Sequence, residues 1–135
     1  ELEVTEDEMM DFGEQGVALL DHLAALGVGL AIDDFGTGHS SLLRLKRMPV
    51  HKLKIDRGFV VDLPCSDSDS AMARAIIALG KSLQLRVIAE GVETAAQEAL
   101  LHELGCDLGQ GYLYNRPMPA AELETMLQQT RHLAD

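Results

Sequence analysis

Two adjacent carboxylates, Asp33 and Asp34, are the residues of this sequence best placed to do chemistry. They come at the end of the apolar, β-branched run Val28–Ile32, which predicts a buried strand, and a glycine-rich loop follows them. Such a pair could simply form a turn and cap the next helix. Two neighbouring acids at the end of a buried strand are costly, however, unless a cation neutralises them. The pair therefore indicates either a cap or a cation site.

Further polar residues recur toward the carboxyl ends of the other predicted strands. They are Glu3, Glu6, Lys54, Asp56, Glu90, Glu93 and Gln110. Polar residues inside otherwise apolar strands are informative, because most strand interiors of this kind are buried. Parallel α/β folds build their active sites at the carboxyl ends of the strands. Agreement among all the predicted strands is hard to explain as solvated surface and indicates a functional site.

The residue types select a class of cation. The acids expected to cluster, opposed by the single amine of Lys54, are Glu3, Asp33, Asp34 and Glu90. Oxygen ligands without a cysteine cluster favour hard divalent cations such as Mg²⁺, Mn²⁺ or Ca²⁺. Two such ions suit phosphodiester hydrolysis, because they lower the pKa of a water and stabilise charged phosphoryl oxygens. Lys54 could orient that water or stabilise developing charge.

The elements that must position these residues alternate along the chain. Strands are predicted at Leu2–Thr5, Val28–Ile32, Lys52–Asp56, Arg86–Ala89 and, as strand or loop, Asp107–Tyr112. Helices are predicted over about Asp11–Leu26, Ser40–Met48, Ala71–Leu83, Thr94–Leu104 and Ala120–His132. Strand–helix repeats of this kind predict a parallel sheet with crossover helices. About five βα units are a little over half of a (β/α)8 barrel, but a flavodoxin-like sheet also uses five strands, so periodicity leaves both open.

Composition narrows the class of protein. The chain has 135 residues, 47% of them hydrophobic, which is enough for one domain with an aliphatic core. Its formal charge of -11 argues against binding a nucleic acid polymer, which needs a basic patch. Cys65 and Cys106 match no zinc spacing and fit the reducing cytoplasm. No apolar run predicts a membrane span, so any membrane contact would come through other domains of the parent protein.

Five motifs, taken together in their order and spacing, resemble a known family. They are Glu3-Val-Thr-Glu6, Asp33-Asp34-Phe-Gly-Thr-Gly38, Lys54-Ile-Asp56, Ala89-Glu90-Gly-Val-Glu93 and Gly109-Gln110-Gly-Tyr-Leu113. The family is that of the EAL-type cyclic di-GMP phosphodiesterases, and the resemblance covers essentially the whole chain. It implies a modified (β/α)8 TIM-like barrel that linearises cyclic di-GMP with one or two Mg²⁺ or Mn²⁺ ions.

The resemblance also implies roles for single residues. The implied metal ligands are Glu3, Asp33, Asp34, Asp56 and Glu90. Lys54 is implied to hold or activate the attacking water, with Glu93 as a supporting catalytic residue. Gln110 and Pro117 are implied to lie at the substrate, and Glu6 is implied to anchor the loop that follows Asp34.

The chain departs from the family at its beginning. Residues 1–135 are expected to be the C-terminal portion of an EAL domain, because the strands with the Glu-Ala-Leu motif and an Asn ligand are missing. Glu98-Ala99-Leu100 spells the same letters but falls inside a predicted helix. The parent protein is expected to be an active hydrolase, and this piece alone inactive unless another chain completes the barrel. Open strand edges predict a homodimer or a swapped oligomer.

Two alternative functions follow from the same residues. A degenerate barrel could act as a non-catalytic module that binds cyclic di-GMP without cutting it, although the acids expected in this part of the domain are all present. A phosphorylation receiver domain also uses an acidic pair, an Asp and a Lys. The order of residues argues against it, because Lys54 precedes Asp56 by two positions instead of following on a later strand.

Overall fold

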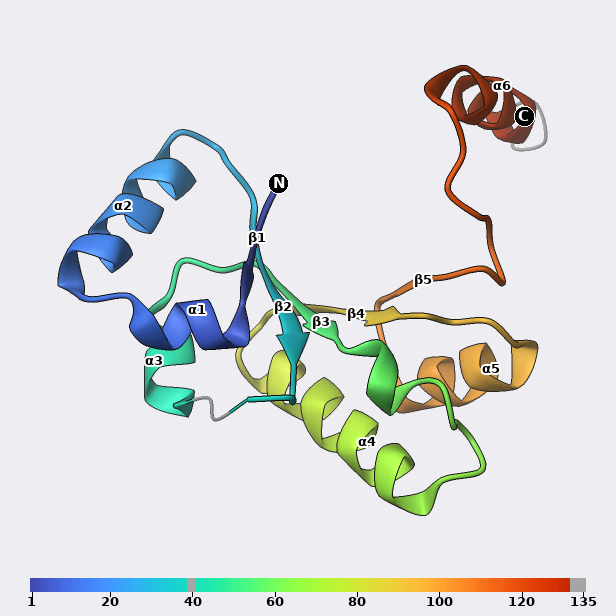
Figure 1. Cartoon of the computed structure of the whole chain (residues 1–135), viewed down its shortest axis with the longest axis horizontal. Helices are drawn as coiled ribbons and strands as arrows, with labels where there is room; N and C mark the ends of the chain where they lie inside the picture. Colours follow the sequence, from blue (N-terminus) through green and yellow to red (C-terminus); the bar gives the residue numbers. More distant parts are fainter. Residues whose placement is uncertain (39–40, 132–135) are drawn as a thin grey trace.

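The computed structural model describes residues 1–38 and 41–131, in which parallel strands alternate with helices. The strands are β1 (Leu2–Thr5), β2 (Leu30–Phe35), β3 (Lys52–Ile55), β4 (Arg86–Glu90) and β5 (Leu108–Gln110). The helices are α1 (Glu6–Asp11), α2 (Glu14–Ala25), α3 (Leu42–Arg47), α4 (Asp67–Ser82), α5 (Ala95–Leu104) and α6 (Ala120–Arg131), with a 3-10 turn η1 (Arg57–Phe59). Figure 1 shows α6 standing apart from the sheet.

The sheet decides between the two architectures that the sequence left open. Its strands lie in the order β1-β2-β3-β4-β5, and each pairs in parallel with the next. A flavodoxin-like sheet would place its second strand outside the first. Sequential parallel order is instead that of a (β/α)8 barrel, so the predicted partial TIM-like barrel of five βα units is confirmed.

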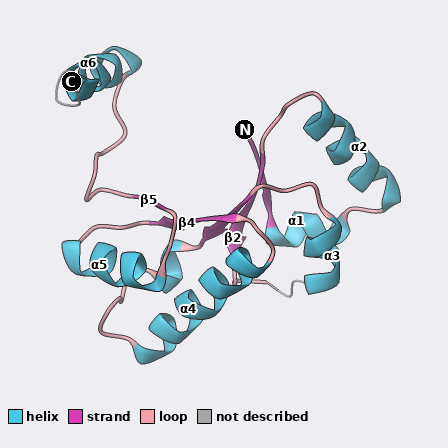
Figure 2. Cartoon of the chain, turned by 180° about the vertical axis from the view of Figure 1, so that it is seen from behind, coloured by secondary structure: helices cyan, strands magenta, loops and turns pink. Residues whose placement is uncertain are grey.

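An aliphatic core joins the central strands to the helices beneath them. Ile32, Leu53 and Val87 are fully buried, and Ile77 of α4 packs into the same cluster. The helices α4 and α5 lie along one face of the sheet, as Figure 2 shows. A Cβ at Gly80 would lie 2.3 Å from Cγ2 of Val87, so glycine permits the close approach of α4 to β4. No helix within residues 1–38 and 41–131 combines the length and the apolar character that a bilayer crossing demands.

The strand β2 differs from its prediction in a way that matters for the site. It covers Leu30–Phe35 instead of Val28–Ile32, so Asp33 and Asp34 lie within the strand and not after it. Its register with β3 shifts between Ile32 and Phe35, and Asp34 has a positive φ of 53°. Irregularities of this kind redirect side chains next to functional sites. Here the irregularity falls at the two acids.

A short helix that was not predicted precedes the first predicted one. The helix predicted over about Asp11–Leu26 is α2, Glu14–Ala25, whereas α1 starts directly after β1 and ends before Gly13. The cause is the capping box: the Thr5 hydroxyl accepts from the Glu8 amide at 3.3 Å, and the Glu8 carboxylate accepts from the Thr5 amide at 3.0 Å. This early start places Glu6 in the first turn of a helix immediately beside the sheet.

The remaining boundaries differ by a few residues. The helix predicted over Ser40–Met48 is α3, Leu42–Arg47, and Ser40 lies outside the described residues. The helix α4 begins before the predicted Ala71, because Ser66 accepts from the Asp69 amide at 3.2 Å. The last helix ends at Arg131, and the predicted end, His132, also lies outside the described part of the chain.

Candidate metal centre

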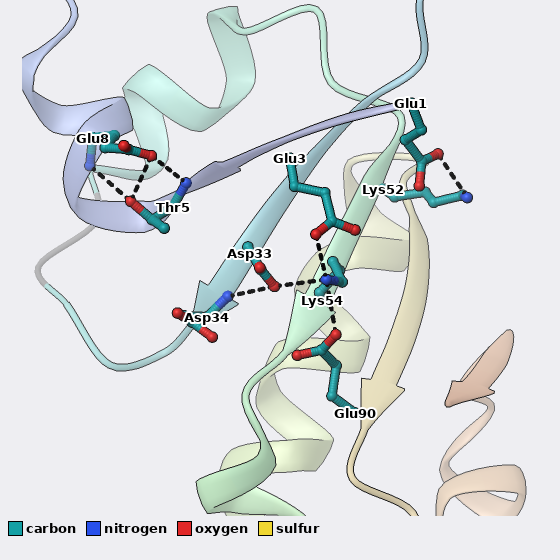
Figure 3. A network of polar contacts seen from close by, with 9 residues as sticks. All are labelled: Glu1, Glu3, Thr5, Glu8, Asp33, Asp34, Lys52, Lys54 and Glu90. Carbon is teal, nitrogen blue, oxygen red and sulfur yellow. Dashed lines mark hydrogen bonds and ion pairs between the residues drawn. The ribbon is translucent and has the colours of Figure 1, made fainter. Parts of the chain in front are cut away.

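Four neighbouring strands bring their polar side chains together around the ammonium group of Lys54. The nitrogen Nζ of Lys54 on β3 lies 2.9 Å from Oε2 of Glu3 on β1 and 2.9 Å from Oδ1 of Asp33 on β2. It lies 2.8 Å from Oε1 of Glu90, at the end of β4. Figure 3 shows these side chains converging at one place above the sheet. Acids that are far apart in sequence thus share one counter-ion.

The Lys54 side chain is only 7% exposed, yet it stays charged. Burial by itself would lower its pKa, but hydrogen bonds to Glu90, Asp33 and Glu3 outweigh burial and raise the pKa above the usual value. Lys54 is therefore an ammonium ion at neutral pH. In this arrangement it donates hydrogen bonds and supplies positive charge, and it cannot serve as a general base.

Three carboxylates form a group suited to a metal ion. One oxygen each from Asp33, Asp34 and Glu90 lies within 4.8 Å of the others. Burial raises the pKa of Asp34, and the charges of Asp33 and Asp56 raise it further. This repulsion is what a divalent cation would relieve. The donor set, all oxygen and all acidic, fits Mg²⁺ or Mn²⁺.

The other predicted ligands lie beside this group. Glu3 reaches Lys54 but does not belong to the three-carboxylate group. Asp56 follows β3, and its Oδ1 accepts from the Gly58 amide at 2.8 Å while its charge acts on Asp34. Glu3 and Asp56 thus add negative charge next to the three-carboxylate group without belonging to it.

The predicted catalytic and substrate residues fall partly into one pocket. Glu93 and Gln110 line a pocket of about 220 Å³ that Glu90 also lines, so this pocket adjoins the carboxylate group. Pro117 is exposed, lies in the segment between β5 and α6 and is not among the residues that line the pocket. The structure therefore brings Glu93 and Gln110 together with Glu90, but not Pro117.

Glu6 fastens the loop that follows β2. The side chain is only 2% exposed, and its Oε2 accepts from the Gly36 amide at 2.8 Å and from the Gly38 amide at 3.2 Å. This is the contact that a loop anchor requires. Because the loop continues directly from Asp34, the carboxylate holds the backbone next to the candidate metal ligands.

We expect Glu6→Ala to destabilise the complete domain by about 1–3 kcal/mol, because two backbone amides lose their buried acceptor. Glu6→Gln, which keeps a carbonyl oxygen, should cost less. Glu103→Ala, at an exposed position of α5, is the matched control and should change stability by no more than about 0.5 kcal/mol. Urea denaturation measures all three, and equal losses for Glu6→Ala and Glu103→Ala would contradict the anchoring role.

Two residues that the sequence analysis did not select hold the loops at the site. Nη2 of Arg57 lies 2.8 Å from Oε1 of Glu93. Gln97, 3% exposed, accepts from the Glu93 amide at 2.7 Å and donates to the Val61 carbonyl at 3.0 Å. Arg57 directly follows the Lys54-Ile-Asp56 motif, and this position next to a motif could have indicated that Arg57 lies at the site. The link from Gln97 to Val61 spans 36 positions and left no local signal.

Comparison with known proteins identifies the family. A sequence model described as the EAL domain matches residues 1–117. The chain belongs to the EAL domain family. Cyclic di-GMP phosphodiesterase NbdA of Pseudomonas aeruginosa is 53% identical over 131 residues, which are 97% of this chain and 17% of the relative. Bifunctional diguanylate cyclase/cyclic di-GMP phosphodiesterase MucR of the same organism is 53% identical over 122 residues, 90% of this chain and 18% of the relative.

Solved structures of EAL proteins share the fold. PaMucR phosphodiesterase in complex with c-di-GMP matches with a TM-score of 0.86 and 53% identity, over 90% of this chain and 49% of that one. Klebsiella pneumoniae BlrP1, in a complex with manganese and cyclic di-GMP, matches with a TM-score of 0.78 and 38% identity, over 85% of this chain and 29% of that one. The chain thus spans less than a fifth of the curated relatives NbdA and MucR and about half of the PaMucR structure.

Proposed function

We propose that this EAL chain is part of a metal-dependent phosphodiesterase that hydrolyses cyclic di-GMP to the linear dinucleotide. The observation that carries the proposal is the convergence of Glu3, Asp33 and Glu90 on Lys54, with Asp34 completing a three-carboxylate group. The relatives named as cyclic di-GMP phosphodiesterases and the PaMucR complex with c-di-GMP support this choice of substrate.

Asp33, Asp34 and Glu90 would hold Mg²⁺ or Mn²⁺, with Glu3 and Asp56 beside them. When bound, one or two such ions lower the pKa of a water and stabilise charge on phosphoryl oxygens. The manganese complex of BlrP1 supports the choice of metal. Contacts with Glu90, Asp33 and Glu3 raise the pKa of Lys54, so its ammonium would orient the attacking water and stabilise negative charge by donating hydrogen bonds.

We infer further that the chain is the C-terminal part of its EAL domain. The structure of the Mycobacterium smegmatis DcpA EAL domain matches 94% of this chain, but this match accounts for only 57% of the DcpA chain. Five strands leave β1 and β5 each with one unpaired edge in the described sheet. The complete domain would be the active unit, and the isolated chain would be inactive.

Hydrolysis by the complete domain tests the proposal directly. We expect purified protein stripped of metal with EDTA to be inactive, and addition of Mn²⁺ or Mg²⁺ to restore conversion of cyclic di-GMP to the linear dinucleotide. Chromatographic separation of substrate and product measures the rate. Metal-replete protein that binds cyclic di-GMP without converting it would contradict the proposal and establish the non-catalytic binding module instead.

The homodimer and the cytoplasmic location expected from the sequence stay predictions. Leu42 and Leu43 of α3 give the dimer a candidate surface, because both side chains are more than half exposed. Both leucines come soon after the loop whose Gly36–Gly38 part Glu6 anchors. A partner bound to α3 would therefore contact a helix only a few residues along the chain from Asp33 and Asp34.

A further inference from the structure

A single guanidinium group stands in the pocket beside the carboxylates. The residues lining this pocket of about 220 Å³ are Arg57, Glu90, Gly91, Glu93, Gln110, Gly111 and Tyr112. Among these described residues Arg57 is the only cation. Glu90 belongs both to this pocket and to the three-carboxylate group. A ligand that reaches the metal centre can therefore extend into the pocket and meet Arg57.

Glycines shape the pocket so that Arg57 fits against its wall. Gly91 has a φ of +70°, and a Cβ there would lie 2.4 Å from Cγ of Arg57. The side-chain stem of Arg57 thus lies directly against the backbone that follows Glu90. A Cβ at Gly111 would lie 2.1 Å from the Val92 carbonyl, so the opposite segment also approaches closely. The close packing fixes the base of the Arg57 side chain while its head stays accessible, with 61% of the side chain exposed.

Charge explains why an anionic ligand needs this residue. Lys54 gives its hydrogen bonds to three carboxylates, and the site as a whole is acidic. Arg57 contacts Glu93 through Nη2, and a guanidinium group has five N–H donors in a planar fork. Donors therefore remain for a second anion, and the fork matches the geometry of a phosphate. Tyr112, on the same pocket, carries the guanidinium of Arg116 over its ring at 4.9 Å, which adds positive charge at the rim.

We propose that Arg57 is a substrate-binding residue that contacts the phosphodiester group of cyclic di-GMP that is not being cleaved. The proposal rests on the proposed function, since it takes the substrate from it. A cyclic dinucleotide carries two phosphodiester groups, and the carboxylate-held metal would take the one that reacts. The adjoining pocket offers the second group the guanidinium of Arg57 beside the carboxylates of Glu90 and Glu93. Glu93 keeps the guanidinium turned toward the pocket through the 2.8 Å ion pair.

The test compares Arg57→Ala and Arg57→Lys with wild type in the complete domain, using cyclic di-GMP and Mn²⁺. We expect Arg57→Ala to raise KM about tenfold and to leave kcat within about twofold, because an interaction made equally in the ground and transition states is lost. Arg57→Lys should recover part of the loss, because an ammonium still binds phosphate as a point charge but lacks the planar fork. Arg86→Ala is the matched control: Arg86 is exposed at the first residue of β4, at the opposite end from Glu90.

The outcomes separate this inference from the proposed function. Normal turnover by wild type with an unchanged KM in Arg57→Ala would overturn the inference alone. A fall in kcat at constant KM would also overturn it, because Arg57 would then act only by positioning Glu93. An Arg57→Lys variant as impaired as Arg57→Ala would also overturn it, because a contact with a phosphodiester must keep part of its affinity when another cation replaces Arg57. If wild type binds without hydrolysis, the same tenfold change is expected in Kd from calorimetry, and if it neither hydrolyses nor binds, both proposals fail.

Discussion

Replacing Lys54 with alanine should lower the turnover of cyclic di-GMP by the complete domain by about 10²–10³-fold, the usual cost of removing one preorganised donor. Lys54 is the residue toward which three strands direct their acids, and its ammonium lies 2.8–2.9 Å from each of three carboxylates. Without it, the candidate site is left with negative charge alone among these side chains. The charge that develops on the phosphodiester would then lose the hydrogen-bond donor that Lys54 supplies.

The neighbouring lysine supplies the control. Lys52 lies two positions earlier on β3 and pairs with Glu1 at 2.7 Å, away from the cluster, as Figure 3 shows. Lys52→Ala should keep turnover within about twofold of wild type, because this partly exposed pair lies outside the cluster. Asp33→Asn, which preserves shape and removes one candidate ligand charge, should lose turnover to a similar extent as Lys54→Ala. If Lys54→Ala and Asp33→Asn both retain wild-type turnover, the assignment of the site is wrong.

Manganese should stabilise the complete domain against heat, because only the folded state assembles Asp33, Asp34 and Glu90. At a metal concentration of 100 times Kd the expected gain is about 2.7 kcal/mol. Asp33→Asn should lose most of this gain, since one of three close carboxylate ligands becomes a neutral amide. Thermal unfolding with EDTA and with Mn²⁺ measures the difference, and it does so without any substrate.

The Lys54→Met variant tests whether Lys54 and the metal share the same carboxylates. In EDTA the variant should be less stable than wild type by about 1–3 kcal/mol, less than for a fully buried pair because the carboxylates are partly exposed. In Mn²⁺ it should gain more than wild type, because the ammonium and the metal compete for Asp33 and Glu90. Lys52→Met should follow wild type in both conditions. Equal metal-induced shifts in Lys54→Met and wild type would show that lysine and metal do not share these ligands.

The local features of this protein were readable from its sequence. The helix predicted over Thr94–Leu104 is α5, and its start could be predicted because the capping box of Thr94 and Gln97 involves residues only three positions apart. The alternation of strands and helices predicted the parallel sheet, because the apolar pattern of each strand or helix lies within one short segment of the chain. The acids could be selected from the sequence because a charged residue within an apolar strand stands out, even when the residue it contacts in the fold is unknown.

The tertiary structure decided what depends on partners distant in the chain. Strand order separated the barrel from a flavodoxin-like sheet, because the deciding pair, β2 with β3, is a contact between segments 21 residues apart, such as Ile32 and Leu53. Likewise β2 continues past Ile32 because Thr5 of β1 pairs with Asp33 and Ile55 of β3 pairs with Phe35, which the apolar run Val28–Ile32 could not indicate. The hydrogen bonds that the Gly36 and Gly38 amides donate to Glu6, and the pairing of Arg57 with Glu93, likewise exist only once the strands are side by side. Residue types fixed which chemistry was available, and the sheet fixed which of these residues meet, because periodicity describes one segment and a site is made of several.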